Sequence, residues 1–168
     1  MGDNEDKFIS ILENHKGIIY KITNSYCKNI SDQQDLVQEI ILQLWKSYPK
    51  YDNQYKLSTW IYRIALNTSI SNYRKNKVRK EKTTELTPIL TTSVNEVSPM
   101  EEEKYSDLQK FIKELKEIDK AIILLYLDDL SQKEISKIMG ITSSNVSTRI
   151  NRIKISLKQK FNTKNHSS

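Results

Sequence analysis

The sequence predicts an all-α fold made of two small helical domains joined by a flexible linker. Apolar residues recur at helical spacing through most of the 168 residues, and only 3 Gly and 3 Pro interrupt them. Hydrophobic residues make up 37 % of the chain, which suits two small cores better than one large core. We expect the domains at residues 1–82 and 105–162, with the linker at residues 83–104.

The first domain is expected to be a bundle of three or four helices. The first helix spans roughly residues 5–28, where the apolar positions repeat every three or four residues. The second ends near Pro49, because the residue before a proline disfavours helical backbone. The third ends in the basic run 74–80. The expected N-caps are Ser31 or Asp32 for the second helix and Ser58 or Thr59 for the third.

The charge is distributed in three blocks along the chain. Residues 1–82 carry a net charge of +5, residues 83–104 a net charge of −4, and residues 105–168 a net charge of +5. Two basic segments on either side of an acidic one fit a protein that contacts a polyanion at two places, and on charge alone they fit ordinary solvated surfaces equally well. The segment 83–100 is rich in Thr, Ser and Pro and has no sustained period, so it is expected to be an extended linker.

Several classes of protein are disfavoured by composition. The single cysteine, Cys27, cannot build a disulfide framework or a four-ligand zinc site, and we expect neither a metal nor a cofactor. The chain has two histidines, His15 and His166, and no glycine-rich phosphate loop, so it is not expected to be an enzyme. No apolar run reaches 18 residues and the N-terminus is acidic, which predicts a cytoplasmic protein without membrane insertion.

Residues 131–157 have the pattern of a helix-turn-helix. Ser131 and Glu134 form a capping box, and Gly140 follows where the first helix must end in the left-handed conformation. Thr142 or Ser143 caps the second helix. The second helix then carries an apolar stripe, Val146, Ile150, Ile153 and Leu157.

The opposite face of this second helix is polar and basic. Residues at the N-terminal end of such a helix enter the major groove and contact base edges or phosphates. Six basic residues and no acidic one occur from Arg149 onward, which predicts a phosphate-facing edge. The candidate DNA-contacting residues are Ser143, Ser144, Asn145, Thr148, Arg149 and Arg152.

The first domain also has features beyond helix packing. Asp35, Gln38 and Glu39 lie beside an apolar stripe, on a face that a protein partner could contact. Asn67 lies one turn beyond Arg63, on a face that could read an extruded base. Aromatic rings also cluster near a basic helix, a combination on which single-stranded bases stack, although Trp60 equally fits a core position. These aromatic residues are Tyr51, Tyr55, Trp60, Tyr62 and Tyr73.

Two stretches resemble conserved regions of bacterial sigma factors. Asp35-Leu36-Val37-Gln38-Glu39 through Leu44-Trp45-Lys46, followed by Ser58-Thr59-Trp60-Ile61-Tyr62-Arg63-Ile64-Ala65-Leu66-Asn67, resembles their second region. The helix-turn-helix from Leu130 to Lys160 resembles their fourth region. No third region lies between them, which is the layout of the extracytoplasmic-function (ECF) subfamily. The amino-acid sequence from Asn145 to Lys154 resembles that of members from Bacteroidetes-type bacteria.

The resemblance implies a sigma factor that binds core RNA polymerase and directs promoter-specific initiation of transcription. It implies promoter DNA as a second partner, both as duplex and as melted single strand, and an anti-sigma factor as a further candidate. The implied polymerase-docking residues are Asp35, Gln38 and Glu39, supported by Leu36 and Trp45. The implied minus-ten residues are Tyr55, Lys56, Ser58, Trp60, Tyr62, Arg63, Asn67 and Arg74. The implied minus-thirty-five readers are the six candidates between Ser143 and Arg152.

Some positions depart from the family pattern. Ser71 stands where an aspartate is usual, Ser136 where an alanine is usual, and Ser147 where a lysine is common. One alternative remains open from the residues alone: a helix-turn-helix regulator that acts without being a polymerase subunit. It predicts tight operator binding in the absence of polymerase.

Overall fold

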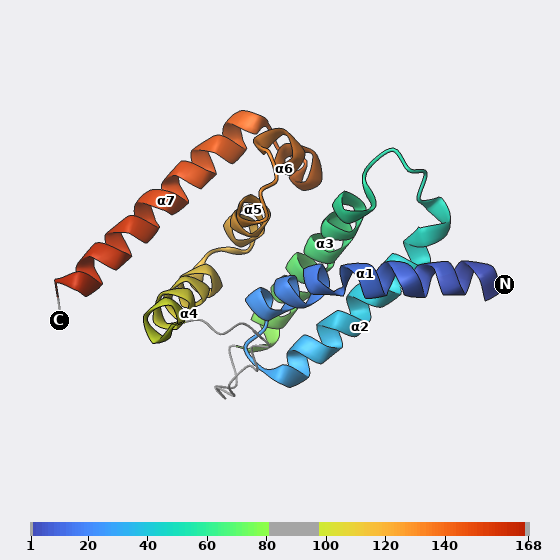
Figure 1. Ribbon diagram of the computed structural model, residues 1–168, viewed down its shortest axis with the longest axis horizontal. Coiled ribbons are helices and arrows are strands. Elements are labelled where there is room, and N and C mark those ends of the chain that lie inside the picture. The colour runs from blue at the N-terminus through green and yellow to red at the C-terminus, as the bar shows by residue number, and fades with distance from the viewer. Residues whose placement is uncertain (1, 81–97, 167–168) are drawn as a thin grey trace. The chain divides into compact units, whose positions relative to one another are not determined.

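The computed structural model describes residues 2–80 and 98–166, in which every regular element is a helix (Figure 1). The all-α prediction is therefore confirmed for the described residues. The chain divides into two compact units, unit 1 at residues 1–94 and unit 2 at residues 95–168. Most of the predicted linker, residues 83–97, lies outside the described residues.

Unit 1 is a three-helix bundle. It consists of α1 (Gly2–Tyr26), α2 (Ile30–Ser47), a short 3₁₀ helix η1 (Tyr48–Lys50) and α3 (Leu57–Lys80). Each of the three α-helices contacts the other two, so one apolar stripe from each meets in a shared core. The fully buried large side chains of this core are Ile22, Leu36, Ile40, Leu44, Ile61 and Leu66.

Two helices of unit 1 begin earlier than predicted. Asn29 caps α2, because its Oδ1 accepts a hydrogen bond from the Asp32 backbone N–H at 2.8 Å. Ser31 and Asp32 therefore lie inside the helix and are not its caps. Similarly, α3 starts at Leu57, and the Trp60 backbone N–H donates to the Lys56 carbonyl at 3.1 Å. The predicted caps Ser58 and Thr59 are thus residues of the first helical turn.

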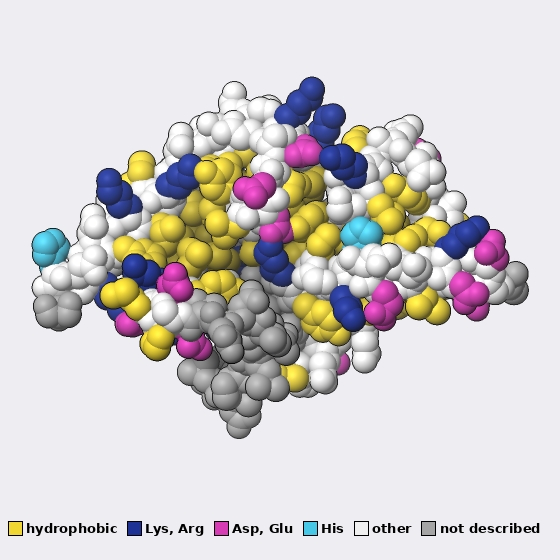
Figure 2. Space-filling model, viewed as in Figure 1, with side chains coloured by type: hydrophobic (Ala, Val, Ile, Leu, Met, Phe, Trp, Pro, Cys, Tyr) yellow, Lys and Arg dark blue, Asp and Glu magenta, His cyan; other side chains and the backbone are white. Residues whose placement is uncertain are grey.

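Unit 2 contains four helices: α4 (Pro99–Glu114), α5 (Glu117–Leu127), α6 (Gln132–Met139) and α7 (Ser143–Asn165). In Figure 2, hydrophobic side chains of this unit gather between α7 and the α4–α5 pair. Residues 99–104, predicted to be linker, are instead the first turns of α4. The Ser98 hydroxyl caps α4 by accepting a hydrogen bond from the Glu101 backbone N–H at 3.4 Å. Pro99 is favourable at the first helical position, because the N–H that proline lacks would have no partner within the helix there.

The turn between α6 and α7 agrees with the sequence pattern. Ser131 Oγ accepts from the Glu134 N–H at 3.1 Å, while Glu134 Oε2 accepts from the Ser131 N–H at 2.8 Å. Gly140 has φ +67°, the left-handed conformation that glycine adopts without steric cost. Thr142 caps α7, and the Ser136 hydroxyl donates to the Ile141 carbonyl at 2.5 Å. The helix-turn-helix prediction is confirmed, and Ser136 adds a hydrogen bond that alanine could not make.

Candidate polymerase and DNA interfaces

The outer face of α2 carries the predicted docking residues. Asp35 and Gln38 are exposed, whereas Glu39 is half-buried and accepts from Gln43 Nε2 at 2.9 Å. Leu36 points the other way and is 1 % exposed, so it belongs to the core and supports the face from beneath.

The same outer face also carries two large apolar side chains. Leu42 is 44 % exposed and Trp45 is 41 % exposed, and both follow Asp35 at helical spacings of seven and ten residues. The Trp45 ring is held edge-on by Phe8, with ring centroids 4.9 Å apart. Leu42 was not among the predicted site residues. Its position seven residues after Asp35, on the side opposite the apolar stripe, was the signal in the sequence that could have identified it.

One face of α3 brings together three of the predicted minus-ten residues. Arg63, Asn67 and Arg74 are all exposed, and their spacings of four and seven residues place them on one side of the helix. Trp60 lies at the start of this face and is half-buried. The alternative that Trp60 serves the core is therefore partly right, since its ring packs on Tyr51 at a centroid distance of 5.1 Å.

Tyr62, also predicted as a minus-ten residue, lies away from this face. Its side chain is only 7 % exposed, because residue 62 falls on the side of α3 that packs into the bundle. Burial raises the pKa of the Tyr62 phenol, since the charged phenolate would lose its hydration. A ring in this position is not open to stacking by a single-stranded base in this structure.

The loop before α3 is held by its own hydrogen bonds. The Tyr51 hydroxyl donates to the Tyr55 carbonyl at 2.7 Å, and Asp52 Oδ1 accepts from the Gln54 N–H at 3.1 Å. Asn53 has φ +60°, which asparagine tolerates better than most residues. The Tyr55 side chain is left 44 % exposed. A groove of about 790 Å³ adjoins the loop, and its lining includes Trp45, Tyr48, Pro49, Tyr51, Asn53 and Leu57.

The N-terminal end of α7 presents the predicted minus-thirty-five residues. Ser143, Ser144, Asn145, Thr148 and Arg152 are all exposed. The Thr148 hydroxyl donates to the Ser144 carbonyl at 2.9 Å, so its oxygen remains able to accept a hydrogen bond from outside. Arg149 differs from the others because it is half-buried and pairs with Asp119 of α5 at 2.7 Å.

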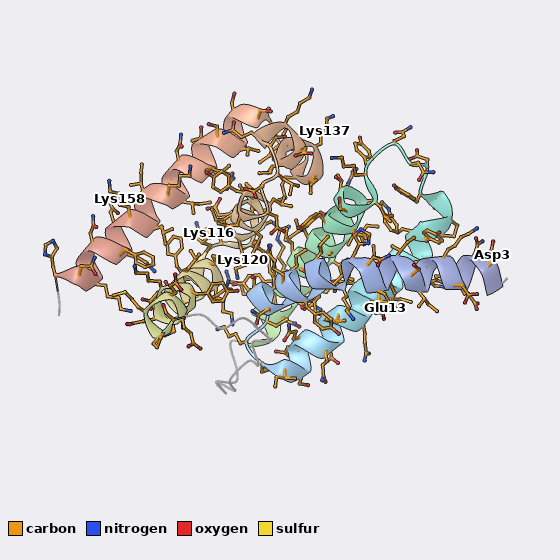
Figure 3. All side chains as sticks on the ribbon, in the orientation of Figure 1. Asp3, Glu13, Lys116, Lys120, Lys137 and Lys158 are labelled. Atoms are coloured by element: carbon orange, nitrogen blue, oxygen red, sulfur yellow. The ribbon has the colours of Figure 1, made fainter. Side chains whose placement is uncertain are left out.

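The predicted phosphate-facing edge of α7 is only partly available. Lys160 pairs with Glu114, and Lys164 pairs with Asp107 at 2.5 Å, both on α4. Lys154 lies over the Tyr126 ring of α5, 4.6 Å from its centroid. All three side chains remain exposed, but each is engaged by a neighbouring helix of unit 2, which a count of charges along the chain could not show. Arg152 and Lys158 are exposed as well, and Figure 3 shows Lys158 on the outer side of the helix.

No site with the geometry of a metal centre occurs within residues 2–80 and 98–166: no three His, Cys, Asp or Glu side chains there are grouped to hold an ion. His15 lies on the surface of α1, where its Nδ1 is 2.9 Å from the Ile11 carbonyl, and Cys27 is buried. None of the helices in this described part is both long and apolar enough to cross a membrane.

Comparison with known families assigns both units. Residues 11–79 match the family model of sigma-70 region 2, and residues 105–157 match that of sigma-70 region 4. The chain is 30 % identical over 168 residues to the ECF RNA polymerase sigma factor SigW of Bacillus subtilis, which covers 94 % of this chain and 90 % of that protein. It is 31 % identical over 150 residues to the RNA polymerase sigma factor SigV of the same organism, covering 86 % and 84 %.

Solved structures share the fold. One is the sigma factor RpoE of Bartonella quintana in complex with the anti-sigma factor NepR, with a TM-score of 0.71, 16 % identity, and coverage of 95 % of this chain and 96 % of that chain. Another is CnrH in complex with the cytosolic domain of CnrY, with a TM-score of 0.68, 18 % identity, and coverage of 95 % and 90 %.

The chain belongs to the ECF-type group of the sigma-70 family. It is accordingly an RNA polymerase sigma factor, the subunit through which the polymerase initiates transcription at promoters. The alternative of a regulator that acts without polymerase is disfavoured, because the family match includes the first unit as well as the helix-turn-helix.

Proposed function

We propose that the outer face of α2 is the surface that docks on core RNA polymerase. The face combines two exposed polar residues, Asp35 and Gln38, with the exposed apolar side chains of Leu42 and Trp45. An apolar centre with a polar rim is the usual composition of a protein interface. Leu42 thereby joins Asp35, Gln38 and Glu39 in the proposed docking set.

The loop from Tyr51 to Lys56 and the exposed face of α3 are proposed to capture the melted minus-ten strand. Arg63 and Arg74 supply positive charge along the face, and Asn67 between them can hydrogen-bond a base edge. Tyr55 offers an exposed ring for stacking, and the adjoining groove has room for an extruded base. Lys56, Ser58 and Trp60 lie at the start of the same helix, whereas Tyr62 supports it from within the bundle.

The N-terminal end of α7 is proposed to read the minus-thirty-five element as duplex DNA. A recognition helix contacts base edges with the residues of its first turns, where Ser143, Ser144 and Asn145 are exposed in α7. Residues 1–82 would then dock on polymerase and melt the promoter, and residues 105–162, together with the start of α4 at Pro99, would read the upstream element.

Opening the minus-ten element costs a few kcal/mol of unstacking for each extruded base. Stacking on aromatic side chains returns ~1–3 kcal/mol per base, so recognition of flipped bases can drive the melting step. No covalent chemistry by this chain is required, and we propose that it is not an enzyme. Its place of action would be the cytoplasm, where RNA polymerase works.

An anti-sigma factor remains a proposed partner. The support comes from the two similar structures, in which RpoE is bound to an anti-sigma factor and CnrH is bound to the cytosolic domain of CnrY.

The resemblance to Bacteroidetes-type members comes from the sequence between Asn145 and Lys154, and it stays a prediction.

The observation that carries the proposal is the separation of three exposed faces, which predicts separable defects. Labelled full-length protein is titrated with core polymerase, and promoter opening is then followed by permanganate reactivity. Asp35→Ala combined with Leu42→Ala should weaken polymerase binding at least tenfold, because it removes both polar and apolar contacts. Asn67→Ala should bind polymerase normally and fail to open the promoter.

Glu13→Ala is the matched control for docking. Glu13 is an exposed acidic residue on α1, and its loss should leave polymerase binding unchanged (Figure 3). Equal weakening by Glu13→Ala would mean that bulk charge, and not the α2 face, determines binding. Wild-type behaviour of the α2 variant would place the docking surface elsewhere.

A further inference from the structure

Arg149 connects the recognition helix to α5 through two hydrogen bonds. Its Nη1 donates to Asp119 Oδ1 at 2.7 Å, and its Nε donates to Asn145 Oδ1 at 2.9 Å. Asp119 lies in the first turn of α5, thirty residues before Arg149, and Asn145 lies in the first turns of α7. The guanidinium is thus fixed between a buried helix and the exposed start of the recognition helix.

The Asp119–Arg149 pair is shielded from solvent more than the Lys160–Glu114 pair of the same unit. The two side chains are 28 % and 21 % exposed, whereas Lys160 and Glu114 are 55 % and 63 % exposed. Partly buried pairs are screened less by salt than exposed pairs, and the planar guanidinium holds its hydrogen bonds in a fixed geometry. Arg149 therefore has one preferred orientation, which Asp119 imposes.

This orientation has a consequence for Asn145. A guanidinium has only donors, so the Asn145 amide must turn its oxygen toward Arg149. Its NH₂ group keeps both donors for a ligand, whereas the oxygen is directed toward Arg149 and keeps only one lone pair. Bidentate recognition of adenine requires both the amide oxygen and the NH₂ group, whereas guanine presents two acceptors, N7 and O6.

We infer that Asp119 is a positioning residue for promoter specificity: through Arg149 it presents Asn145 to the minus-thirty-five element as a hydrogen-bond donor. The base pair that Asn145 contacts should carry an acceptor edge, with guanine favoured over adenine. The inference rests on the proposed role of α7 as the reader of this element. Asp119 itself does not touch DNA.

The test uses holoenzyme assembled from native core polymerase and the full-length chain, on a promoter library randomised across the minus-thirty-five element. Asn145→Ala first identifies the base pair that Asn145 reads. Asp119→Ala should change the preference at that same base pair, reducing the discrimination of guanine over adenine about fivefold or more, because one good contact discriminates by roughly 1–3 kcal/mol. The other base pairs and the minus-ten preference should be unchanged.

Two further variants separate positioning from a loss of folding. Asp119→Glu keeps the carboxylate within reach of Arg149 and should restore most of the preference. Glu114→Ala breaks the Lys160 ion pair elsewhere in unit 2 and should leave the preference intact. In an Asn145→Ala background, Asp119→Ala should add no further change at that base pair.

The outcomes distinguish this inference from the proposed function. If the wild-type holoenzyme shows no minus-thirty-five preference, the proposed reading role of α7 fails. If the wild type shows a preference that Asp119→Ala leaves unchanged, or weakens equally at every base pair, only the positioning role of Asp119 is overturned.

Discussion

Lys164 Nζ lies 2.5 Å from Asp107 Oδ2, an ion pair that joins the end of α7 to α4 across 57 residues of sequence. Lys160 makes a parallel pair with Glu114 and also lies over the Phe111 ring, 5.4 Å from its centroid. Both lysines therefore pair with α4, although their side chains are more than half exposed. Arg152 and Lys158, the outward cations, lie outside these two ion pairs, and we expect them to be the cations of α7 most available to DNA phosphates.

The outward cations should determine the salt dependence of promoter binding. Replacing Arg152 or Lys158 with alanine should weaken binding of holoenzyme to promoter duplex and reduce the slope of log affinity against log salt by roughly 1 each, because one phosphate contact is lost. Lys160→Ala is the matched control and should change the slope little. Affinities measured across a series of KCl concentrations check this, and a Lys160 effect equal to that of Lys158 would contradict it.

Lys164 should titrate above the usual range for lysine. The hydrogen bond with Asp107 is the largest cause and outweighs burial, which lowers the pKa; together with the charges of Asp107 and Glu103 it raises the pKa of Lys164 above its ordinary value. A group whose pKa is raised by folding stabilises the fold fully below its unfolded pKa, and the contribution is lost as pH rises through the folded pKa. While the Asp107 carboxylate is charged, the contribution of Lys164 should therefore be fully present below about pH 10 and be lost in strong alkali.

NMR titration of lysine side chains labelled at Cε measures this pKa directly. Asp107→Asn should return the pKa of Lys164 toward the ordinary value. Glu114→Gln, which affects Lys160 instead, should leave the Lys164 titration unchanged. An unchanged Lys164 pKa in Asp107→Asn would show that the ion pair does not persist in solution.

Gly140 and Gly17 should respond to alanine in opposite directions. Gly140 has φ +67° with open space around its absent Cβ, so Gly140→Ala should lower the free energy of unfolding of unit 2 by about 1–2 kcal/mol through backbone strain alone. Gly17 lies within α1, also in open space, so Gly17→Ala should stabilise unit 1 by about 0.5–1 kcal/mol.

Denaturant unfolding separates the two effects, because Trp45 and Trp60, the only tryptophans, both lie in unit 1. Gly17→Ala should shift the tryptophan fluorescence transition to higher denaturant. Gly140→Ala should shift only the unfolding of unit 2, which circular dichroism detects and tryptophan fluorescence does not. A stabilising effect of Gly140→Ala would contradict the left-handed conformation.

Tyr55 should contribute to promoter opening through its ring. Tyr55→Ala should reduce formation of the open complex roughly fivefold or more, because stacking contributes ~1–3 kcal/mol per base. Tyr55→Phe keeps the ring, and the Tyr55 carbonyl that accepts from Tyr51 is unaffected in either variant, so opening should be nearly normal. Tyr20→Ala removes another exposed tyrosine, on α1, as a control. Permanganate reactivity of melted thymines measures opening, and equal defects in Tyr55→Ala and Tyr55→Phe would exclude stacking.

The features that the sequence predicted well depend on residues within one or two helical turns. The capping box of Ser131 and Glu134, the left-handed Gly140 and the apolar stripe of α7 are local, so composition and spacing suffice to identify them. Helix starts were predicted less well, because several polar residues within four positions can each act as the N-cap of the same helix. Asn29 is the N-cap of α2, where Ser31 or Asp32 was expected. Likewise, Ser98 and Pro99 began a helix inside the predicted linker.

The helical class, the helix-turn-helix and the candidate interface residues could therefore be predicted from the order of residues alone. Which of these side chains are exposed depends on how the helices pack. Tyr62 is buried in the bundle, and Arg149 donates a hydrogen bond to Asp119, which lies thirty residues away on another helix. The reason is physical: a helical period defines faces, but which face is buried, and which charge meets its opposite, depends on helices that are distant in the sequence.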